Sequence, residues 1–266
     1  MKSMPLSILA VPAFDDNYLW IVHNGRDAIV IDPGDGEVIT RRLQELSLNL
    51  VAILITHHHA DHIGGVAFLR TLFKVPVFGP DDARITALTQ RLPLSEHPQA
   101  ISIAELNLSF EVLSVPGHTR SHIAYYNEEH AMLFCGDTLF AGGCGRIFEG
   151  TAAQMHASLH KLAALPDETS VYCAHEYTLS NLQFALAVDP ENPKLKRRFE
   201  LVQQQRQQGL ATVPSTIAIE RETNPFLRSS ETKIRQELIR LQKIAEAADD
   251  IAVFAAIREW KNHFRA

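Results

Sequence analysis

The chain has 266 residues, enough for one large domain or two modest ones at roughly 150 residues each. Hydrophobic residues make up 46% and charged residues 21%, which is typical of a soluble globular protein and argues against a disordered chain. The net charge of −6 argues against non-specific nucleic-acid binding, which needs a basic surface. The three cysteines offer no disulfide framework, whereas the 13 histidines, the commonest metal ligand, raise the question of where they lie.

The N-terminal segment lacks the pattern of a secretory signal. Its apolar stretch is interrupted by Pro5 and Pro12 and is soon followed by Asp15 and Asp16. The longest apolar run, residues 50–55, is too short to span a bilayer. With few cysteines and no targeting segment, the sequence predicts a cytoplasmic protein without a membrane partner.

Residues 1–175 are predicted to alternate strands and helices. Two short apolar runs are separated by a segment containing Asn24-Gly25, the strongest local signal for a β-hairpin. Helices are predicted over 37–46 and 64–73. Strands are predicted over 18–22, 28–31, 50–56, 75–78, 106–115, 131–135 and 170–173. This alternation predicts an α/β layered domain.

Strand signals nearly vanish after Tyr177, and helical patterns replace them. Gly209 is placed to end one helix, and Asp249 or Asp250 to cap another. We therefore expect two domains, 1–175 and 176–266, of which the second is all-helical. Its predicted helices cover 179–188, 193–208, 231–244 and 250–264.

A histidine-rich segment, THHHADHIGG, directly follows a predicted buried strand. In an extended segment alternate residues share a side, so His57 and His59 should point the same way and His58 elsewhere. Asp61 and His62 follow where the chain turns toward the next helix. One short segment can thus present two pairs of metal ligands, and each pair needs further partners to complete a site.

Three other predicted strands are also followed directly by a possible ligand. These residues are His118, Asp137 and His175. Sites in α/β layers form beyond the carboxyl ends of strands, and buried ionisable groups are costly unless paired or bound to a metal. One shared site is therefore the simplest interpretation.

The candidate ligands number seven, more than the three or four that one zinc ion takes. Seven ligands suit two metals about 3.5–4 Å apart that share one carboxylate and bridge a hydroxide. A nitrogen and oxygen ligand set fits zinc, and also iron or manganese. The seven are His57, His59, Asp61, His62, His118, Asp137 and His175.

These motifs resemble known families at two levels. Residues 56–65 match the THxHxDHxGG motif of the metallo-β-lactamase superfamily. Later blocks are similar to those of the glyoxalase II (hydroxyacylglutathione hydrolase) family, and together the blocks cover nearly the whole chain. They are residues 12–18, 134–140, 142–146, 148–151, 173–178 and 258–264.

The resemblance implies a fold and a division of the ligands. The fold would be an αββα sandwich, α/β in class, followed by a helical substrate-binding domain. Asp137 would bridge two divalent ions and, with Asp61, would serve catalysis. One ion would take His57, His59 and His118, and the other Asp61, His62 and His175.

The resemblance also implies a reaction, the hydrolysis of S-D-lactoylglutathione to D-lactate and glutathione (EC 3.1.2.6 type). This is the second step of methylglyoxal detoxification. Metal-bridging hydroxide would attack the thioester carbonyl, and the leaving thiolate, of pKa about 8.5, would depart with little help from an acid. Zinc is the expected metal, with iron or manganese as alternatives, and we expect a monomer.

Glutathione carries two carboxylates, so its site should offer cations. Arg258 and Lys261 share one face of the predicted last helix, and the resemblance implies that they hold the glycine carboxylate. Arg146 occupies a position that is basic in the family, and Tyr177 would donate a hydrogen bond to the peptide. Phe148 stands where some relatives carry Tyr, so one hydroxyl contact would be missing.

Several residues near these motifs have two interpretations. Asp32 is either a partner that orients a ligating histidine or a simple turn residue, and for His122 a structural hydrogen bond is favoured. The three cysteines are expected to be buried, inert thiols. The remaining histidines, among them His156 and His160, are expected to lie on the surface.

Three other functions compete with thioester hydrolysis. A different superfamily hydrolase, acting on lactones, phosphodiesters or β-lactams, would share the metal motif but would have no need of the C-terminal cations. A mononuclear iron persulfide dioxygenase needs only three protein ligands, so Asp61, His62 and His175 would be idle. Non-catalytic metal storage is disfavoured by a seven-ligand internal site.

Overall fold

The computed structural model describes residues 5–95, 97 and 99–265. Two compact units emerge from the contacts within it. The first comprises the chain through Ser114 together with Ser121–Gly136, and the second comprises Val115–Arg120 together with the chain from Asp137 onward. This division differs from the expected boundary at residue 175. The reason is that helix α4 (Ala152–Ala163) and strand β13 (Ser170–Cys173) have most of their contacts with elements that follow them.

The first unit contains a mixed six-stranded sheet in the order β1 to β6. Strands β1 to β3 are antiparallel, and β3 to β6 run parallel to one another. The predicted hairpin is confirmed: His23 pairs with Ala28, and Gly25 takes a φ of +87°, which glycine adopts without strain. The strands are β1 (Ser7–Ala13), β2 (Asn17–His23), β3 (Asp27–Ile31), β4 (Asn49–Leu54), β5 (Val77–Pro80) and β6 (Gln90–Leu92).

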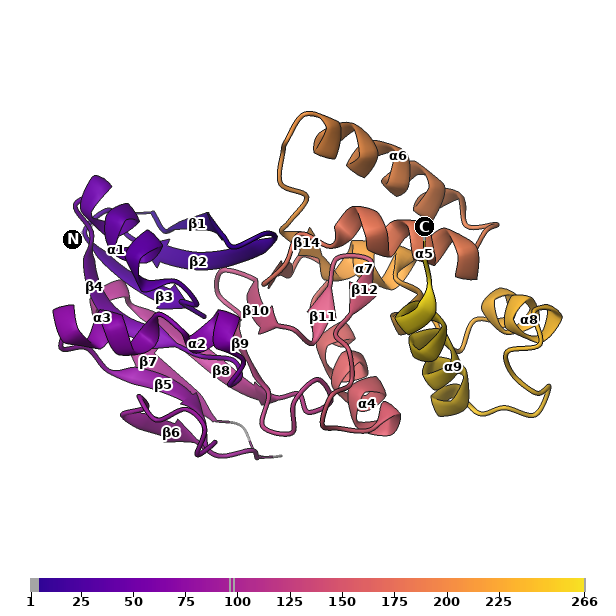
Figure 1. Ribbon diagram of the computed structural model, residues 1–266, viewed down its shortest axis with the longest axis horizontal. Coiled ribbons are helices and arrows are strands. Elements are labelled where there is room, and N and C mark those ends of the chain that lie inside the picture. Colours follow the sequence, from indigo (N-terminus) through magenta and orange to yellow (C-terminus); the bar gives the residue numbers. More distant parts are fainter. Residues whose placement is uncertain (1–4, 96, 98, 266) are drawn as a thin grey trace. The chain divides into compact units, whose positions relative to one another are not determined.

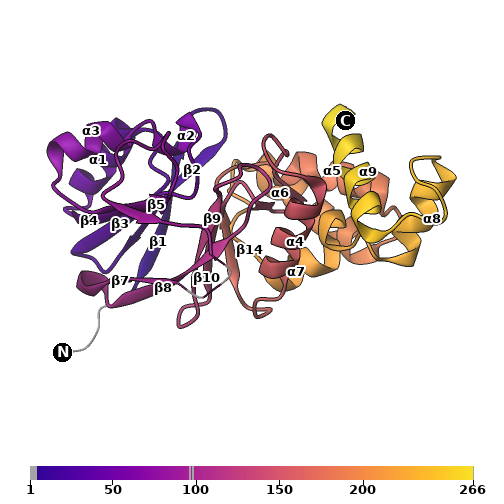
Figure 2. The same ribbon diagram turned by 90° about the horizontal axis from the view of Figure 1, so that it is seen from below.

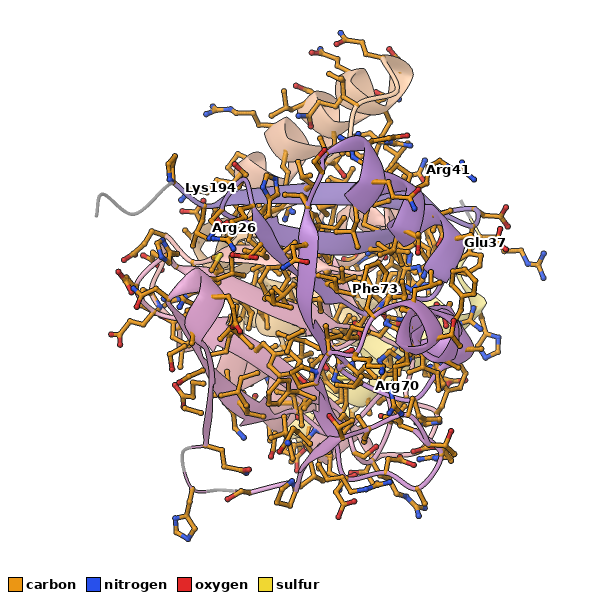
Figure 3. All side chains as sticks on the ribbon, turned by 90° about the vertical axis from the view of Figure 1, so that its left-hand side faces the viewer. Arg26, Glu37, Arg41, Arg70, Phe73 and Lys194 are labelled. Carbon is orange, nitrogen blue, oxygen red and sulfur yellow. The ribbon has the colours of Figure 1, made fainter. Side chains whose placement is uncertain are left out.

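Helices α1 (Gly36–Glu45), α2 (Ala60–Ile63) and α3 (Val66–Leu72) lie on one side of this sheet (Figure 1). Helix α1 begins at Asp35, whose carboxylate accepts hydrogen bonds from the Glu37 and Val38 amides, both 3.0 Å long. Its apolar residues pack into the core of the sheet. Glu37 and Arg41 are exposed on its outer face (Figure 3).

A second, antiparallel sheet of the first unit packs against the other face of the first (Figure 2). Its strands are β7 (Ala100–Ile103), β8 (Leu108–Ser114), β9 (Ile123–Asn127) and β10 (Met132–Gly136), with a 3-10 turn, η1, at Ala104–Leu106. Aromatic rings fill the space between the sheets. The ring centroids of Trp20 and Phe134 lie 6.5 Å apart, and those of Phe110 and Tyr125 lie 6.3 Å apart. The Tyr125 hydroxyl donates to the Ile55 carbonyl at 2.9 Å, which joins the second sheet to the end of β4.

The second unit is mainly helical. Besides α4 and β13 it contains the short strands β11 (Leu139–Phe140), β12 (Gly143–Cys144) and β14 (Ser215–Thr216). Its other helices are α5 (Thr178–Val188), α6 (Pro193–Gln207), α7 (Ile217–Thr223), η2 (Pro225–Leu227), α8 (Thr232–Arg240) and α9 (Asp250–His263). The four helices predicted after residue 177 correspond to α5, α6, α8 and α9, whereas α4 and α7 had not been predicted.

Local signals for helix ends in the second unit are confirmed. Asp249 caps α9 by accepting from the Ala252 amide at 2.8 Å, and Gly209, at φ +71°, follows the end of α6. Leu182 and Leu195 are fully buried between α5 and α6. Among the described residues, no helix is long and apolar enough to cross a bilayer.

Candidate metal centre

The first unit places the histidine-rich segment at an edge of its sheet. Because β3 and β4 are parallel, their carboxyl ends meet there, and Asp32 follows one strand while Thr56 follows the other. Asp32 accepts from the Thr56 amide and from its hydroxyl, both at 2.7 Å. Asp32 holds a left-handed backbone with φ +50°, a conformation that a non-glycine residue keeps only where surrounding contacts enforce it.

His57 and His59 point to the same side, as the alternation predicts. His57 Nε2 lies 3.0 Å from His59 Nδ1, whereas His58 Nδ1 lies 3.7 Å from an Asp82 oxygen. The Thr56 hydroxyl donates its single proton to Asp32 and lies 3.1 Å from His57 Nδ1. It therefore accepts from that nitrogen, which leaves the lone pair of His57 Nε2 available to a metal.

His62 and Asp61 form the other half of this cluster. His62 is buried, and its Nε2 lies 3.4 Å from Asp61 Oδ2, while its Nδ1 lies 3.0 Å from Asp32 Oδ2. Asp61 accepts a 3.0 Å hydrogen bond from the amide of Asn17, which precedes it by 44 residues. Asp32 therefore faces a candidate ligand, which favours the first of its two interpretations, and Asn17 orients Asp61.

The second unit holds a matching cluster around Asp137. Its two carboxylate oxygens face different histidines: Oδ2 lies 3.4 Å from His118 Nε2, and Oδ1 lies 3.4 Å from His175 Nε2. His118 Nδ1 lies 2.8 Å from the Arg146 carbonyl, and a carbonyl can only accept, so Nδ1 carries the proton. Each oxygen of Asp137 therefore faces a different candidate ligand.

The spacing of these atoms fits metal coordination. Two ligand atoms that each lie 2.0–2.1 Å from a tetrahedral ion are about 3.3 Å apart. The closest ligand-atom pairs within each unit are separated by 3.0–3.4 Å. Imidazole nitrogens and carboxylate oxygens suit divalent ions, so the residues present fit such ions.

A glycine is required next to the candidate ligands of the first unit. Gly136 takes a φ of +47°, and a Cβ atom there would lie 2.3 Å from the Thr56 hydroxyl and 3.0 Å from the His122 ring. His122 itself stacks on His57, with ring centroids 4.6 Å apart and planes 18° apart. His122 therefore packs against a candidate ligand, which is consistent with a structural role.

A cavity of about 600 Å³ in the second unit contains every predicted substrate-binding residue. It is lined by His118 and Asp137 and also by the predicted cations on α9. The Tyr177 ring stacks on His175, with centroids 4.7 Å apart and planes 5° apart. The predicted substrate-binding residues along its wall are Arg146, Phe148, Tyr177, Arg258 and Lys261.

Arg258 and Lys261 are cations without a carboxylate partner among the described residues. Arg258 is only 6% exposed, and its Nη1 donates to the Cys144 carbonyl at 2.8 Å, while its Nε has no hydrogen-bond partner in the described structure. Lys261 Nζ donates to the Ser180 carbonyl at 3.0 Å. Burial, together with the neighbouring Arg258 charge, lowers the Lys261 pKa to about 8. Two such cations favour an anionic ligand.

Six further residues that line this cavity were not predicted as site residues: Phe140, Cys144, Ser180, Asn181, Asn262 and Phe264. The Phe140 ring lies 5.7 Å from His175 and 5.3 Å from Tyr177. Phe140 lies within a block that carries the family resemblance, whereas Ser180 and Asn181 lie on an ordinary helical pattern that carries no signal.

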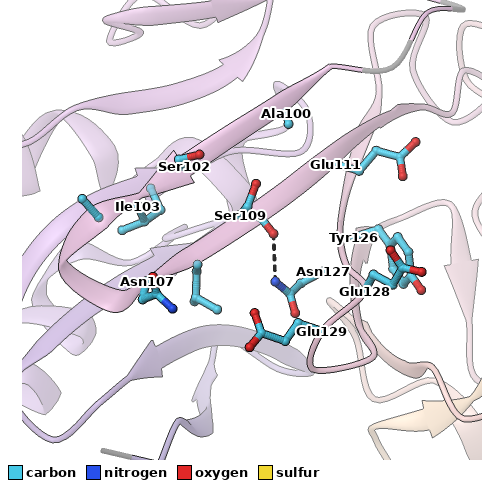
Figure 4. Close-up of a pocket in the computed structure, with 12 residues that line it drawn as sticks. Ala100, Ser102, Ile103, Asn107, Ser109, Glu111, Tyr126, Asn127, Glu128 and Glu129 are labelled. Carbon is cyan, nitrogen blue, oxygen red and sulfur yellow. Dashed lines mark hydrogen bonds between the residues drawn. The ribbon is translucent and has the colours of Figure 1, made fainter. Parts of the chain in front are cut away.

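The thiols of the three cysteines and a further cavity are given no role in this chemistry. All three cysteines are buried, as predicted, and burial raises the pKa of the Cys173 thiol to about 12, which disfavours its thiolate. A hollow of about 520 Å³ in the first unit lies over β7 to β9, where Asn127 donates to the Ser109 carbonyl at 2.8 Å (Figure 4). None of the predicted site residues lines it.

Comparisons with known proteins agree with this geometry. Residues 13–175 match the model of the metallo-beta-lactamase superfamily, and residues 176–264 match that of the hydroxyacylglutathione hydrolase C-terminus. Among curated relatives, the hydroxyacylglutathione hydrolases of Nitrosomonas europaea and Aliivibrio salmonicida are each 50% identical. These matches cover 98% and 97% of this chain, and 97% and 100% of the relatives.

Solved structures show the same fold. The structure of ETHE1 from Myxococcus xanthus matches with a TM-score of 0.62 and 26% identity, covering 97% of this chain and 98% of that one. TTHA1623 in a di-iron-bound form matches with a TM-score of 0.55 and 28% identity, covering 83% and 100%.

The fold and the ligand set define a metal-dependent hydrolase of the metallo-β-lactamase superfamily, with an α/β domain and a C-terminal helical domain. Within that superfamily, the chain belongs to the hydroxyacylglutathione hydrolase family. The resemblance seen in the sequence is thereby confirmed. Its His and Asp groups accord with a requirement for divalent metal ions.

Proposed function

We propose that the protein hydrolyses S-D-lactoylglutathione to D-lactate and glutathione, the second step of methylglyoxal detoxification. Membership of the hydroxyacylglutathione hydrolase family supports this activity. The observation that carries it is the cavity in the second unit, which combines candidate metal ligands with one buried cation, Arg258, and one half-buried cation, Lys261. A substrate with a reactive thioester and a distant carboxylate matches that combination.

The seven predicted ligands are proposed to serve one binuclear site. His57, His59 and His118 would hold one ion, and Asp61, His62 and His175 the other, with Asp137 bridging. The bridging role is supported by the two histidines that face separate oxygens of Asp137. Zinc is proposed as the metal, with iron or manganese as alternatives that suit the same ligands.

The chain's own residues bind and orient the substrate. When bound, the two ions supply hydroxide at neutral pH by lowering the pKa of water to about 7. Arg258 and Lys261 would hold the glycine carboxylate, Arg146 would add positive charge, and the Tyr177 hydroxyl would donate to the peptide. Asp61, oriented by Asn17, would accept a hydrogen bond from the attacking nucleophile and so direct it at the carbonyl.

The leaving group needs little help from the protein. A thiol of pKa about 8.5 is largely stable as a thiolate when it departs, so no general acid is required. Phe148 is 62% exposed, and its ring lies 5.3 Å from that of His118, so it would offer an apolar surface beside the thioester in place of a hydroxyl.

We propose that the boundary between the catalytic and the substrate-binding domain lies at residue 175. Residues 1–175 would form the catalytic domain, and residues 176–266 the helical substrate-binding domain. The match of separate family models to 13–175 and 176–264 supports this boundary. We further propose that the enzyme works as a monomer in the cytoplasm.

The test is thiol release from S-D-lactoylglutathione by the purified, metal-loaded protein, compared with release from a lactoyl thioester that lacks the glutathione carboxylates. Wild type should prefer the glutathione thioester strongly. Arg258→Met should lose that preference because its KM for the glutathione thioester rises, while its turnover of the small thioester stays unchanged. Absence of thiol release from a protein with two bound metals would overturn the proposal, and oxygen uptake with a persulfide would indicate the dioxygenase alternative.

A further inference from the structure

Two histidines on α4 lie apart from every residue assigned above. His156 and His160 are four residues apart, so they face the same side of the helix. Their Nε2 atoms lie 3.1 Å apart, with ring centroids 4.3 Å apart and planes tilted by 50°. Neither residue lines the cavity that holds the candidate ligands of the second unit.

The distance between these nitrogens fits a chelated metal. An ion 2.0–2.1 Å from both Nε2 atoms would see them at an angle of about 100°, between the tetrahedral and the octahedral values. A direct hydrogen bond between the rings needs one proton on one of the two nitrogens. A metal that replaces this proton can use both lone pairs at once.

The surroundings of the pair favour a positive ion. His160 lies in the last turn of α4, where the helix dipole presents its negative end. The carboxylates of Asp249 and Asp250, at the start of α9, act on His156 electrostatically. Asp250 is partly neutralised by Arg235, whose Nη2 donates to it at 2.8 Å.

His156 is also available as a neutral ligand near pH 7. Burial and the neighbouring His160 together lower the pKa of His156, and they outweigh the opposing effect of the two carboxylates. Its ring packs 5.5 Å from Phe254 of α9, and its Nε2 lies 3.4 Å from the hydroxyl of Ser229, which follows η2. The ring is therefore held in place before any ion binds, which reduces the entropy lost on binding.

We propose that His156 and His160 form a separate binding site for one divalent transition-metal ion. Imidazole ligands select Zn²⁺, Cu²⁺ and Ni²⁺ over Mg²⁺ and Ca²⁺. Water and the Ser229 hydroxyl would complete the coordination sphere. The ion would fasten α4 to the segment after η2, because His156 contacts Ser229 there.

The test compares metal binding by the metal-loaded wild-type protein with binding by His160→Gln. His160 is exposed, so its replacement does not threaten the fold. Titration with Zn²⁺ should show that wild type binds one more equivalent than the variant, or that the variant binds this equivalent more than about tenfold more weakly. Loss of a residue that only hydrogen-bonds to a ligand lowers metal affinity at least about tenfold, and loss of a ligand itself should lower it at least as much. His156→Gln and the double variant should lose the same single equivalent.

The matched control is His263→Gln. His263 is also exposed on a helix and is paired four residues away, but with the Glu259 carboxylate at 2.8 Å. This variant should bind as wild type does. As a second measurement, the electron paramagnetic resonance spectrum of one added equivalent of Cu²⁺ should show two nitrogen ligands in wild type and one in His160→Gln.

Two results would overturn the proposal. Either the additional equivalent is absent from wild type, or it persists unchanged in His160→Gln. Both readouts are independent of catalysis, so failure of this site leaves the proposed hydrolase untouched, and loss of hydrolase activity leaves this site untouched.

Discussion

The charge of Lys261 makes the proposed carboxylate site sensitive to pH. Burial and the nearby Arg258 lower its pKa from 10.5 to about 8, so the ammonium is charged below that pH and neutral above it. About 90% of the side chains are charged at pH 7 and about 10% at pH 9. If substrate binds only to the charged form, kcat/KM falls about tenfold over these two pH units.

The assay is thiol release from the glutathione thioester between pH 6.5 and 9.5, corrected for spontaneous hydrolysis. Lys261→Arg is the matched control, because a guanidinium keeps its charge throughout this range. Both proteins share the pH effects of the metal centre and of the substrate. The ratio of wild-type to variant kcat/KM therefore isolates Lys261, and it should fall about tenfold from pH 7 to 9.

Two results would refute this reasoning. A ratio that stays constant from pH 7 to 9 would show that the charge of Lys261 does not bind substrate. An equal decline in Lys261→Met, which has no titrating group at this position, would show that the decline arises elsewhere.

Three further predictions concern the fold and the metals. Asp32→Asn removes a carboxylate that faces His62 Nδ1, and it should weaken metal affinity about 10–100-fold in competition with a chelator; unchanged affinity would contradict that role. Glu220→Gln removes the fully buried carboxylate that pairs with Arg198, and it should lower the free energy of unfolding in urea by about 3–5 kcal/mol, whereas a loss below 1 kcal/mol would count against it. The folded pKa of Lys261 lies below its unfolded value, so this residue makes stability rise as pH increases from about 8 to 10.5; in urea denaturation Lys261→Met should lack that rise, and an unchanged slope would argue against it.

Much of the candidate site could be predicted from the sequence because the patterns that indicate it involve only neighbouring residues. The alternation of an extended chain placed His57 and His59 on one side, which their 3.0 Å separation confirms. The turn at Asn24-Gly25 and the cap at Asp249 are equally local, since each depends on the backbone conformation of a few neighbouring residues. Candidate ligands that directly follow strands could be predicted to lie together because strand ends meet at a sheet edge.

The tertiary structure decided what joins distant segments. Asn17 orients Asp61 from 44 residues away, and Arg258 reaches the Cys144 carbonyl across 114 residues. Glu220 accepts from the Gly142 amide across 78 residues and so holds the β11–β12 hairpin. No periodicity encodes such pairs, because they exist only after packing has placed the two segments together.

The sequence by itself therefore determined the types of the candidate ligands, their order after the strands, and the family to which the chain belongs. Only the tertiary structure showed that Arg258 and Lys261 are cations with no carboxylate partner among the described residues, and that one of them has a lowered pKa. The physical reason is that charge and burial are separate properties. Residue type specifies the charge. The desolvation that favours pairing of this charge with an anion arises only when α9 packs into the second unit.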